Sequence, residues 1–570
     1  MTRASLPFSE IPFSRCGSYF AVSKESDGEI YLRDLHGGDM APSKLYRIDF
    51  KEDNPADIRA DMSENRLILR SRTGECLISM DACDTVYIFC DHIAVGLVAA
   101  EARYDSLIPL GDAQWEHQFY SKNIKVRVAG EGNVAAESIW RVSESESARI
   151  LIDGRERPAL CSLHSYRVVP QDTCPLSPDC AERAAAETAA AYRMWRGETE
   201  PSGDETERIA NYILWSNFVH AGGCLRYDAM YMNKLAMGNI WSWDNCFGAI
   251  ALAAEHPREA LEQLLVVTDH QDESGALPDY VNDMFASYSC LKPPIYGFTI
   301  EKLREKNEFF RSLHVSEILY DSVSKLTNFW LDHRVDERLE LPCYYHGNDS
   351  GWDNASVFHA GVPVCTPDIS AFLILQMDVL SDLAAELQRE NEASVWKERA
   401  DGLQARLLDK LYSGDRFVSR LCRDGSTDST ARSLLDMLPV VIGYRLPGEI
   451  IEKIVGFLER DFERAFGLAT ECPDSRYYRK GGYWLGPVWA PVSYLFIEAL
   501  KRAGYAETAR RLAEKFLRLP LVGGMAENFD PMTGEGYDDN AFAWTASVYL
   551  LLKEEFSSIG KGGILCENDD

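Results

Sequence analysis

The chain has 570 residues, 46% of them hydrophobic, and a formal net charge of −30 at pH 7. A chain of this length exceeds one compact core, so we expect two or more domains. The acidic balance repels phosphate backbones and anionic lipids, which argues against nucleic acid and membrane partners. No apolar run approaches the roughly 18 residues that a membrane-spanning helix needs.

The cysteines and histidines argue against a metal centre of the familiar kinds. The chain has 15 cysteines without any CxxC pair, and 11 histidines without an HExxH motif. The first twenty residues lack the long apolar stretch of a signal peptide, so we expect reduced thiols and a cytoplasmic protein. We expect no metal and no cofactor.

Residues 1–176 are predicted to form a β-rich domain. Short apolar or alternating segments are separated by turn sequences such as SDGE, RTGE and GEGN. The segments are EIYLRDL, KLYRIDF, RLILRSR, TVYIFCDHIAVGLVA and NIKVRVAG. This pattern is typical of antiparallel strands, and we expect an antiparallel β-sandwich-like domain.

A helical linker is predicted at 177–202. Its first part, SPDCAERAAAETAAAYRMWRG, is rich in alanine and ends at Gly197. Alanine favours helix, and glycine commonly ends one. We therefore expect one helix between the two domains.

Residues 203–560 are predicted to form a domain of roughly a dozen helices, spaced as helix-plus-loop units should be. Its plainest unit is a helical hairpin that starts with Thr366 as N-cap and Pro367 in the first turn. The second helix of that hairpin carries an apolar stripe and stops at Gly414. The domain as a whole is expected to be mainly α.

The segments between the predicted helices are long and share one composition. They combine tryptophan and tyrosine with glycine, aspartate and asparagine, and they cover 230–247, 275–283, 344–358, 477–495 and 524–544. Long loops in a compact domain usually carry function. Aromatic faces stack on sugars while acids and amides bind hydroxyl groups, so these loops indicate a saccharide site.

Two carboxylates stand out as a candidate catalytic pair. Asp353 lies in SGWDNAS and Glu527 in GMAENFDP. Hydrolysis of a glycosidic bond needs one protonated and one ionised carboxyl. The tryptophan beside Asp353 would raise its pKa and suit a general acid, while amide donors near Glu527 would keep a base ionised. Either acid could instead be a surface or turn residue. Other candidates are Asp244, Asp279, Asp283, Asp349, Glu471, Asp530, Glu535, Asp538 and Asp539.

Four motifs together resemble a known enzyme family. WSWDNCFGAIAL, SGWDNAS, YWLGPVWAPVSYL and ENFDPMTGE followed by FAWTASVYLLL are similar to glycoside hydrolase family 63. Within it, the chain resembles bacterial mannosylglycerate and glucosylglycerate hydrolases and related α-glucosidases, in the same clan as family 37 trehalases. The resemblance covers about 205–556 in one consistent order.

The resemblance implies an (α/α)6 barrel of inner and outer helices, and hydrolysis with inversion of the anomeric configuration. It implies that Asp353 is the general acid and Glu527 the base, with their carboxyl groups about 6.5 to 9.5 Å apart. It also implies the sugar-binding residues. The residues expected to bind substrate are Tyr231, Asn239, Trp241, Trp243, Asp244, Asp279, Trp352, Asn354, Trp484, Gly486 and Trp489.

Each of these assignments has a structural alternative. The tryptophans could be core residues of the barrel, and Asp244 could cap the helix that follows it. Lys292 and Arg479 could be surface charges or could contact an anionic group of the substrate.

The chain departs from the family pattern at three places. Leu485 and Ser493 stand where the family usually carries arginine and often asparagine, and GNDSGWDNAS lacks the usual HPWESG-like lead-in. These departures lie on the leaving-group side, so glycerate as a leaving group is not supported. We expect an inverting, exo-acting α-glycoside hydrolase, an α-glucosidase, that acts on a small α-linked saccharide or glucoside. The alternatives are a disaccharide phosphorylase on a similar barrel and a catalytically silent carbohydrate-binding protein.

Overall fold

The computed structural model of the protein describes residues 5–50, 58–100, 103–170, 175–197 and 204–559. Contacts between Cα atoms group the chain into two compact units. The first comprises 1–239 and 282–285, and the second comprises 240–281 and 286–570. The domain boundaries expected from the sequence stay a prediction, because compactness alone does not define a domain that folds by itself.

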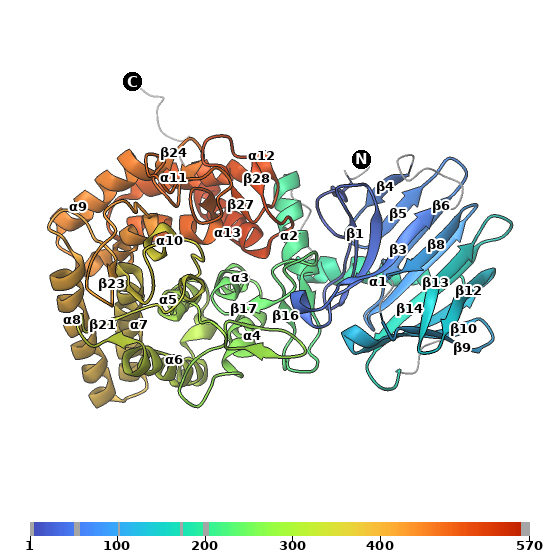
Figure 1. Cartoon of the computed structure of the whole chain (residues 1–570), viewed down its shortest axis with the longest axis horizontal. Helices are drawn as coiled ribbons and strands as arrows, with labels where there is room; N and C mark the ends of the chain where they lie inside the picture. Colours follow the sequence, from blue (N-terminus) through green and yellow to red (C-terminus); the bar gives the residue numbers. More distant parts are fainter. Residues whose placement is uncertain (1–4, 51–57, 101–102, 171–174, 198–203, 560–570) are drawn as a thin grey trace, which may run out of the picture. The chain divides into compact units, whose positions relative to one another are not determined.

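The first unit is built on two antiparallel sheets, drawn in blue to cyan in Figure 1. The six-stranded sheet has the order β1 (Phe20–Lys24), β2 (Ile30–Asp34), β3 (Lys44–Phe50), β8 (Ala94–Ala99), β13 (Glu144–Asp153) and β12 (Val134–Arg141). The eight-stranded sheet has the order β4 (Arg59–Met62), β5 (Leu67–Arg70), β6 (Glu75–Met80), β7 (Thr85–Asp91), β14 (Ala159–Tyr166), β11 (Ile124–Glu131), β10 (Gln114–Phe119) and β9 (Ser106–Gly111). All five strand-forming segments expected from the sequence are strands.

Side-chain burial in these strands follows the period of two that a sheet with one covered face requires. In β11, Ile124, Val126 and Val128 are buried, while the intervening Lys125 and Arg127 are partly exposed. The buried faces of the two sheets supply the core of the unit. The prediction of an antiparallel β-sandwich-like N-terminal domain is confirmed.

The alanine-rich segment forms helix α1 (Cys180–Trp195), as predicted. Its small side chains let it lie closely on the eight-stranded sheet, where Cys180 and Ala181 pack with Leu77 and Leu160. Helix α2 (Glu205–Ser216) follows in the same unit, and the side chain of Asp204 caps it by accepting from the Glu207 amide at 3.2 Å.

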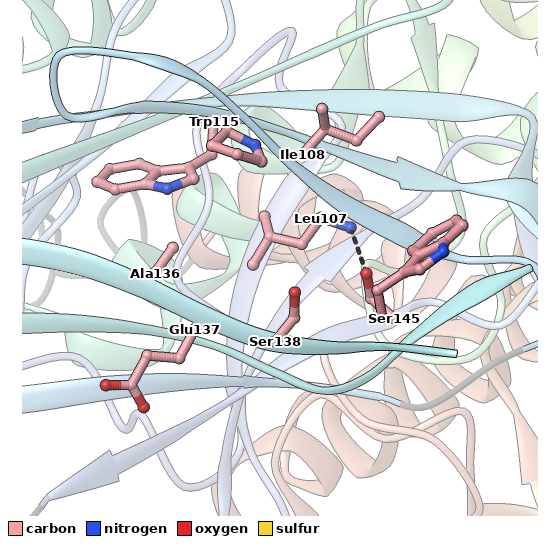
Figure 2. A pocket seen from close by; sticks show the side chains of 9 residues that line it. Leu107, Ile108, Trp115, Ala136, Glu137, Ser138 and Ser145 are labelled. Atoms are coloured by element: carbon pink, nitrogen blue, oxygen red, sulfur yellow. Dashed lines mark hydrogen bonds between the residues drawn. The ribbon is translucent and has the colours of Figure 1, made fainter. Parts of the chain in front are cut away.

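A surface pocket of about 550 Å³ opens in the first unit, where β9 and β10 approach β12 and β13. Figure 2 shows Trp115 and Ile108 on one side, with Glu137 and Ser138 on the other. The amide of Leu107 donates a 3.1 Å hydrogen bond to the hydroxyl oxygen of Ser145 and so ties β9 to β13. The pocket therefore lies where the edges of the two sheets meet.

The second unit is helical and runs from green to red in Figure 1. Its helices are α3 (Asp244–Leu252), α4 (Pro257–Thr268), α5 (Tyr296–Lys306), α6 (Leu313–His333), α7 (Pro367–Glu386), α8 (Glu390–Leu411), η7 (Leu434–Arg445), α9 (Gly448–Phe457), α10 (Ala490–Arg502), α11 (Ala506–Leu517), α12 (Leu519–Gly523) and α13 (Ala543–Ile559). Neighbour contacts lead from α3 through α5, α7, η7, α10 and α13 back to α3, so these six elements close into a ring.

A second layer of helices covers this ring. Helix α4 packs on α3, α6 and α8 on α7, α9 on η7, and α11 on α10. Burial separates the two layers: α7 is buried on nearly all sides, whereas α8 buries only one stripe, from Ala393 through Trp396 to Leu411. A helix that is apolar all round belongs inside, and an amphipathic helix belongs at the surface. Among the helices formed by described residues, none is long and apolar enough to cross a membrane.

The helical hairpin expected at 366–414 is formed by α7 and α8, with Thr366 as N-cap and Pro367 in the first turn. The Thr366 side chain makes no capping hydrogen bond, in contrast to its expected role. Two inner elements, α5 and η7, were not recognised in the sequence. Element η7 is a 3₁₀ helix that contains Pro439 and a non-helical Ile442, so the usual period of 3.6 residues is missing there.

Short antiparallel pairings precede three inner helices. Strand β17 (Ile240–Trp241) leads into α3, β22 (Val364–Cys365) into α7, and β26 (Val488–Trp489) into α10. The pairing of β26 with β27 (Asn528–Phe529) joins the segment before α10 to the segment before α13. The long aromatic loops are thus drawn together where inner helices begin.

Candidate active site

Five tryptophans from four separate segments of the helical unit form one cluster, which we call the tryptophan cluster. The rings of Trp484 and Trp489 stack with centroids 3.9 Å apart, and Trp352 lies 4.9 Å from Trp484. Trp243 lies 6.2 Å from both Trp484 and Trp544. All five are buried. The indole N–H of Trp484 has no hydrogen-bond partner among the described residues, although it is buried. A buried donor of this kind is normally paired, so a bound ligand would be its natural partner.

Glu527 is held through its side chain by Tyr483 and through its backbone by Trp544 of this cluster. The hydroxyl of Tyr483 donates to Oε1 of Glu527 at 2.9 Å. The indole N–H of Trp544 donates to the backbone carbonyl of Glu527 at 3.1 Å, and that of Trp489 donates to the carbonyl of Tyr483 at 3.1 Å. Tyr483 has φ of 63°, in the left-handed region that non-glycine residues rarely occupy. Such a conformation often marks a functional position.

Asp353 lies in residues 344–364, which we call the Asp353 loop. Its neighbour Asn354 fastens this loop to the segment that carries Tyr483. The Asn354 side-chain amide donates to the carbonyl of Gly482 at 3.1 Å, and its oxygen accepts from the amide of Trp484 at 2.9 Å. Asp353 and Glu527 are therefore both connected to one short segment, 482–484, although they are far apart in sequence.

The electrostatics of Tyr483 show which carboxyls surround it. Burial raises the pKa of Tyr483, and the charges of Glu527, Asp353 and Asp244 raise it further. The Tyr483 hydroxyl is thus hydrogen-bonded to one predicted catalytic acid, Glu527, and its pKa is also raised by the charges of the other, Asp353, and of the predicted sugar-binding acid Asp244.

Burial raises the pKa of each of these carboxyls. It raises the pKa of Glu527 to about 8 and that of Asp244 to about 7, and it raises the pKa of Asp353 above its usual range. The hydrogen bond from Tyr483 acts in the other direction on Glu527. We expected amide donors near Glu527, but the amide of the adjacent Asn528 donates to Asp538 at 2.7 Å instead. The side chain that favours ionised Glu527 is a tyrosine.

Lys292 is a buried cation among three acids. Its ammonium lies 2.9 Å from Oδ1 of Asp279 and donates to the carbonyl of Asn348 at 2.9 Å. Burial disfavours the charge of Lys292, but Asp279, Asp353 and Asp244 outweigh it and raise the pKa of Lys292. The ammonium in turn opposes the rise in pKa that burial causes in Asp353. Lys292 is thus not a surface charge.

Asp244 opens α3, where it lies in the first turn after the N-cap residue Trp243. It is buried, and within the described part of the chain its Oδ2 atom has no hydrogen-bond partner. A carboxylate oxygen left in this way can accept a hydrogen bond from a ligand hydroxyl. Asp279 immediately precedes β18 (Tyr280–Val281), which pairs with β17 so that Trp241 lies opposite Tyr280.

Gly486 has a steric role. Its φ is 156°, and a Cβ atom there would lie 2.7 Å from the carbonyl oxygen of Arg479 and 2.8 Å from the ring of Tyr478. Arg479 donates to the carbonyls of Arg476 and Tyr478 at 2.9 and 2.7 Å. These contacts hold the turn of 476–486 together. They do not test whether Gly486 contacts a substrate, so that contact stays a prediction.

Two of the predicted substrate-binding residues belong to the first unit. Tyr231 is fully buried, and its hydroxyl donates to Asp283 at 3.5 Å. Asn239 is also buried, and its side-chain amide donates to Asp39. Their contact with a substrate stays a prediction.

Several alternative acids have structural roles in the helical unit. Asp349 accepts from the amides of Leu291, Tyr345 and His346 at 2.9 to 3.1 Å and pairs with Arg334 at 3.2 Å. Glu471 accepts from the hydroxyl of Ser356 at 2.6 Å and from the amide of Arg432 at 3.0 Å. Asp530 accepts from two backbone amides of its own turn and from the hydroxyl of Tyr537. Their oxygens are occupied by the protein itself.

Sequence reasoning missed two residues of this site and left a third undecided. Tyr483 is part of the YWLGPVW motif but was not singled out, and Trp544 lies in FAWTASV without an assigned role. Lys292 was left open between a surface and a substrate contact. Tyr483 could have been suspected from the two glycines before it, which allow a tight turn, but the target of its hydroxyl is set by tertiary structure.

A ring of inner helices covered by outer ones, with buried carboxyls and a tryptophan cluster at the ends where inner helices begin, defines the class of (α/α)6-barrel glycoside hydrolases. Residues 237–545 match the family described as the mannosylglycerate hydrolase MGH1-like glycoside hydrolase domain. The chain belongs to this family and is a glycoside hydrolase, which confirms the resemblance to glycoside hydrolase family 63.

Individual relatives agree with this assignment. The mannosylglycerate hydrolase of Rubrobacter radiotolerans is 26% identical in an alignment 450 positions long, which covers 62% of this chain and 98% of the relative. The glucosylglycerate hydrolase of Mycolicibacterium hassiacum is 41% identical in an alignment 191 positions long, which covers 32% of this chain and 42% of the relative.

A solved structure carries the same fold. The family 63 mannosylglycerate hydrolase of Thermus thermophilus, in complex with glucose, superposes with a TM-score of 0.52 at 23% identity. The match covers 60% of this chain and 99% of that chain. The predicted fold class, a mainly α chain with an (α/α)6 barrel after a β-sandwich-like domain, is confirmed.

Proposed function

We propose that the protein is an inverting, exo-acting α-glycoside hydrolase in which Asp353 is the general acid and Glu527 the general base. Asp353 protonates the glycosidic oxygen as the bond to the sugar breaks. Glu527 takes a proton from a water molecule that attacks the anomeric carbon from the opposite face. The observation that carries this proposal is the Tyr483 hydroxyl, which binds Glu527 at 2.9 Å while the charges of Asp353 and Asp244 also act on it.

The electrostatics support a working state in which the carboxyls of Asp353 and Glu527 together carry one proton. Burial raises the pKa of Glu527 to about 8, so the pair carries a proton at neutral pH. Catalysis needs that proton on Asp353. Lys292 favours the ionised form of Asp353, and Tyr483 favours the ionised form of Glu527. Substrate binding must therefore place the one proton of the pair on Asp353.

We propose a hexose in the −1 position that stacks on the tryptophan cluster and is bound by Asp244 and Lys292. Among the residues that the structure describes, the Oδ2 of Asp244 and the indole N–H of Trp484 have no hydrogen-bond partner, and they supply one acceptor and one donor for hydroxyl groups. The names of the relatives make glucosylglycerate and mannosylglycerate two natural test substrates. Leu485, which stands where the family carries arginine, favours a leaving group without a carboxylate. Glucose and an uncharged small aglycone are therefore our first choice.

Hydrolysis of a panel of α-linked disaccharides and glycosides, followed by proton NMR, tests the reaction. The panel includes both glycerate glycosides. Initial release of the β-anomer supports inversion, and initial release of the α-anomer would contradict it. Phosphate-dependent release of a sugar 1-phosphate would show that the reaction is phosphorolysis and not hydrolysis. Binding of sugars without turnover of any of them would indicate a silent cleft.

The roles of the two acids are separated by leaving-group dependence. Asp353→Asn should lose about 10²- to 10⁴-fold in rate on unactivated glycosides and recover much of it on substrates with an acidic leaving group, which need no protonation. Glu527→Gln should lose activity on both. Equal losses of Asp353→Asn on both substrate types would contradict the assignment. Asp349→Asn is unsuitable as a control because its oxygens hold three backbone amides, so Glu535→Gln, an exposed acid after Glu527, serves instead.

We also propose that the protein works in the cytoplasm. The sulfurs of Cys365 and Cys422 lie 3.7 Å apart, which is too far for a disulfide bond between them. Reduced thiols at such short range fit a reducing compartment. Mass spectrometry of protein alkylated in intact cells would test this. Cysteine pairs that are joined as disulfides, and therefore not alkylated, would count against it.

A further inference from the structure

Three cysteine sulfurs meet in the helical unit. Cys343, Cys365 and Cys422 are buried, and their Sγ atoms all lie within 4.8 Å of one another. They come from three separate segments: Cys343 follows β21 (Leu341–Pro342), Cys365 ends β22, and Cys422 follows β23 (Arg420–Leu421). The pairing of β22 with β23 and a 3.0 Å hydrogen bond from the amide of Cys422 to the carbonyl of Pro363 fix their mutual positions.

The spacing of the sulfurs matches a thiolate metal site. Zinc binds cysteine sulfur at about 2.3 Å in tetrahedral geometry, which places two ligand sulfurs about 3.8 Å apart. The sulfurs of Cys365 and Cys422 are 3.7 Å apart. A disulfide would need about 2.0 Å, so the pair is spaced for a shared ligand and not for a bond to each other.

The other contacts of these thiols are weak. Cys343 faces the carbonyl of Arg334 at 3.5 Å and Cys365 that of Leu341 at 3.6 Å, which are long sulfur contacts. Three thiolate sulfurs make a ligand set that suits a borderline-soft cation.

The cysteines also stand at the two ends of the Asp353 loop. Cys343 immediately precedes residues 344–364, and Cys365 immediately follows them. Tyr344 and Val364 close the base of this loop by exchanging backbone hydrogen bonds of 2.9 and 3.0 Å. An ion bound to both cysteines would hold the same base from one side and tie it to the β22–β23 pairing.

We propose that Cys343, Cys365 and Cys422 bind one zinc ion, and that this ion is a structural clamp on the base of the Asp353 loop. Each thiol releases its proton to solvent as the metal–sulfur bond forms. Zinc sites rich in cysteine thiolates are typically structural, so the ion serves structure and takes no part in hydrolysis. The expectation of no metal had been based on closely spaced motifs such as CxxC, and these ligands are widely separated in the sequence.

The test uses the full-length protein, stripped of metal with a chelator under reducing conditions. Zinc content is measured before stripping, and Co²⁺ is then titrated in while the thiolate-to-cobalt charge-transfer absorption is recorded. We expect about one zinc per chain, and a cobalt spectrum that saturates at one equivalent and shows thiolate ligation. Zinc should displace the cobalt, and it should raise the thermal midpoint of the stripped protein.

Variants connect the metal to these residues. Cys422→Ser, at the most accessible of the three thiols, and Cys365→Ser should lose the charge-transfer bands and the stabilisation by zinc. Cys161→Ser removes a buried thiol of the first unit and should keep both. Because a cysteine variant could fail to fold, wild-type protein alkylated with and without zinc is compared by peptide mapping, and zinc should protect the three cysteines selectively.

Three results would overturn the proposal: wild-type protein that binds neither zinc nor cobalt through thiolates, cysteine variants that bind them unchanged, or a disulfide between Cys365 and Cys422 in protein isolated from reducing cells. None of these measurements depends on hydrolytic activity. The zinc proposal is therefore tested independently of the assignment of Asp353 and Glu527.

Discussion

The hydroxyl of Tyr483 donates a 2.9 Å hydrogen bond to the carboxylate of Glu527, from a backbone that is in the left-handed conformation. This bond joins the candidate base to the same short segment that Asn354 fastens to the Asp353 loop. The position of one acid relative to the other thus depends on segment 482–484. The predictions below change the contacts of that segment, or the charges around it, one at a time.

Replacing Tyr483 by phenylalanine should slow hydrolysis and shift its pH dependence. The lost hydrogen bond favoured ionised Glu527, so the pKa of Glu527 rises above about 8. The working state of the two acids carries one proton. Because the pKa of Glu527 is about 8, loss of this proton sets the alkaline limb of kcat/KM, and that limb moves to higher pH in the variant. The maximum of kcat/KM falls roughly 10- to 100-fold, because a hydrogen bond to a charged group is worth about 1.5 to 3 kcal/mol. Without this bond the proton stays on Glu527, which then cannot act as the base.

The matched control for this prediction is Tyr477→Phe. Tyr477 lies in the same loop and also donates to a carboxylate, that of Asp428 at 2.7 Å, outside the tryptophan cluster. Its pH profile should match that of the wild type. A Tyr483→Phe profile with the wild-type alkaline limb would show that this hydroxyl does not set the pKa of Glu527.

Glu527→Gln should make the protein more stable at alkaline pH. Burial raises the pKa of Glu527 from its ordinary value of 4.5 to about 8, so folding favours the protonated form. The stability from this shift is complete below about pH 4.5 and is lost as the pH rises through about 8. Glutamine keeps an acceptor for Tyr483 and never ionises, so the variant should exceed wild type by roughly 3 to 5 kcal/mol at about pH 9 and match it near the ordinary pKa of glutamate.

Urea unfolding of both proteins at several pH values measures this difference. Glu535→Gln changes an exposed acid of the same loop and should stay within about 0.5 kcal/mol of wild type at every pH. A constant difference between Glu527→Gln and wild type across the whole acid-to-alkaline range would contradict a raised pKa for Glu527.

Lys292→Met should destabilise the protein and weaken sugar binding. The substitution leaves Asp279, which lay 2.9 Å from the ammonium, buried without its cation. Removing one partner of a buried pair costs about 3 to 5 kcal/mol. The pKa of Asp353 should rise as well, because the ammonium opposes its protonation.

Chemical unfolding and KM for the best substrate report the two effects of Lys292→Met. Lys306→Met breaks the exposed pair with Glu554 and should cost less than about 1 kcal/mol without any change in KM. Equal stabilities of the two variants would mean that Lys292 is not a buried counter-ion.

Asn354→Ala should lower kcat far more than it lowers stability. Two hydrogen bonds between the Asp353 loop and segment 482–484 are lost, at a cost of about 1 kcal/mol each. The loss lets Asp353 move relative to Glu527, and a displacement of about 1 Å can cost roughly 100-fold in rate. Steady-state kinetics beside thermal unfolding separates the effects. Asn391→Ala, at an exposed position of α8, is the control; a kcat of Asn354→Ala as high as that of the control would count against a positioning role.

Much of the fold could be predicted from local sequence. Alternation of apolar and polar residues placed the strands of the first unit, such as 44–50 and 124–131, because a strand repeats every second residue. Helical stripes and end signals placed α7, α8 and α1 within a few residues. Element η7 escaped, because Pro439 and its 3₁₀ winding remove the period on which such reasoning relies.

The sequence by itself determined the class of protein: four motifs in order predicted the family and the (α/α)6 barrel, and composition predicted the loops of aromatic residues and acids. Only the tertiary structure decided what those residues contact. The partner of Glu527 proved to be Tyr483, Lys292 proved to be buried beside Asp279, and three distant cysteines proved to lie together. Local patterns record which face of an element is buried, whereas these contacts join residues far apart in the chain and arise only when the ring of helices closes.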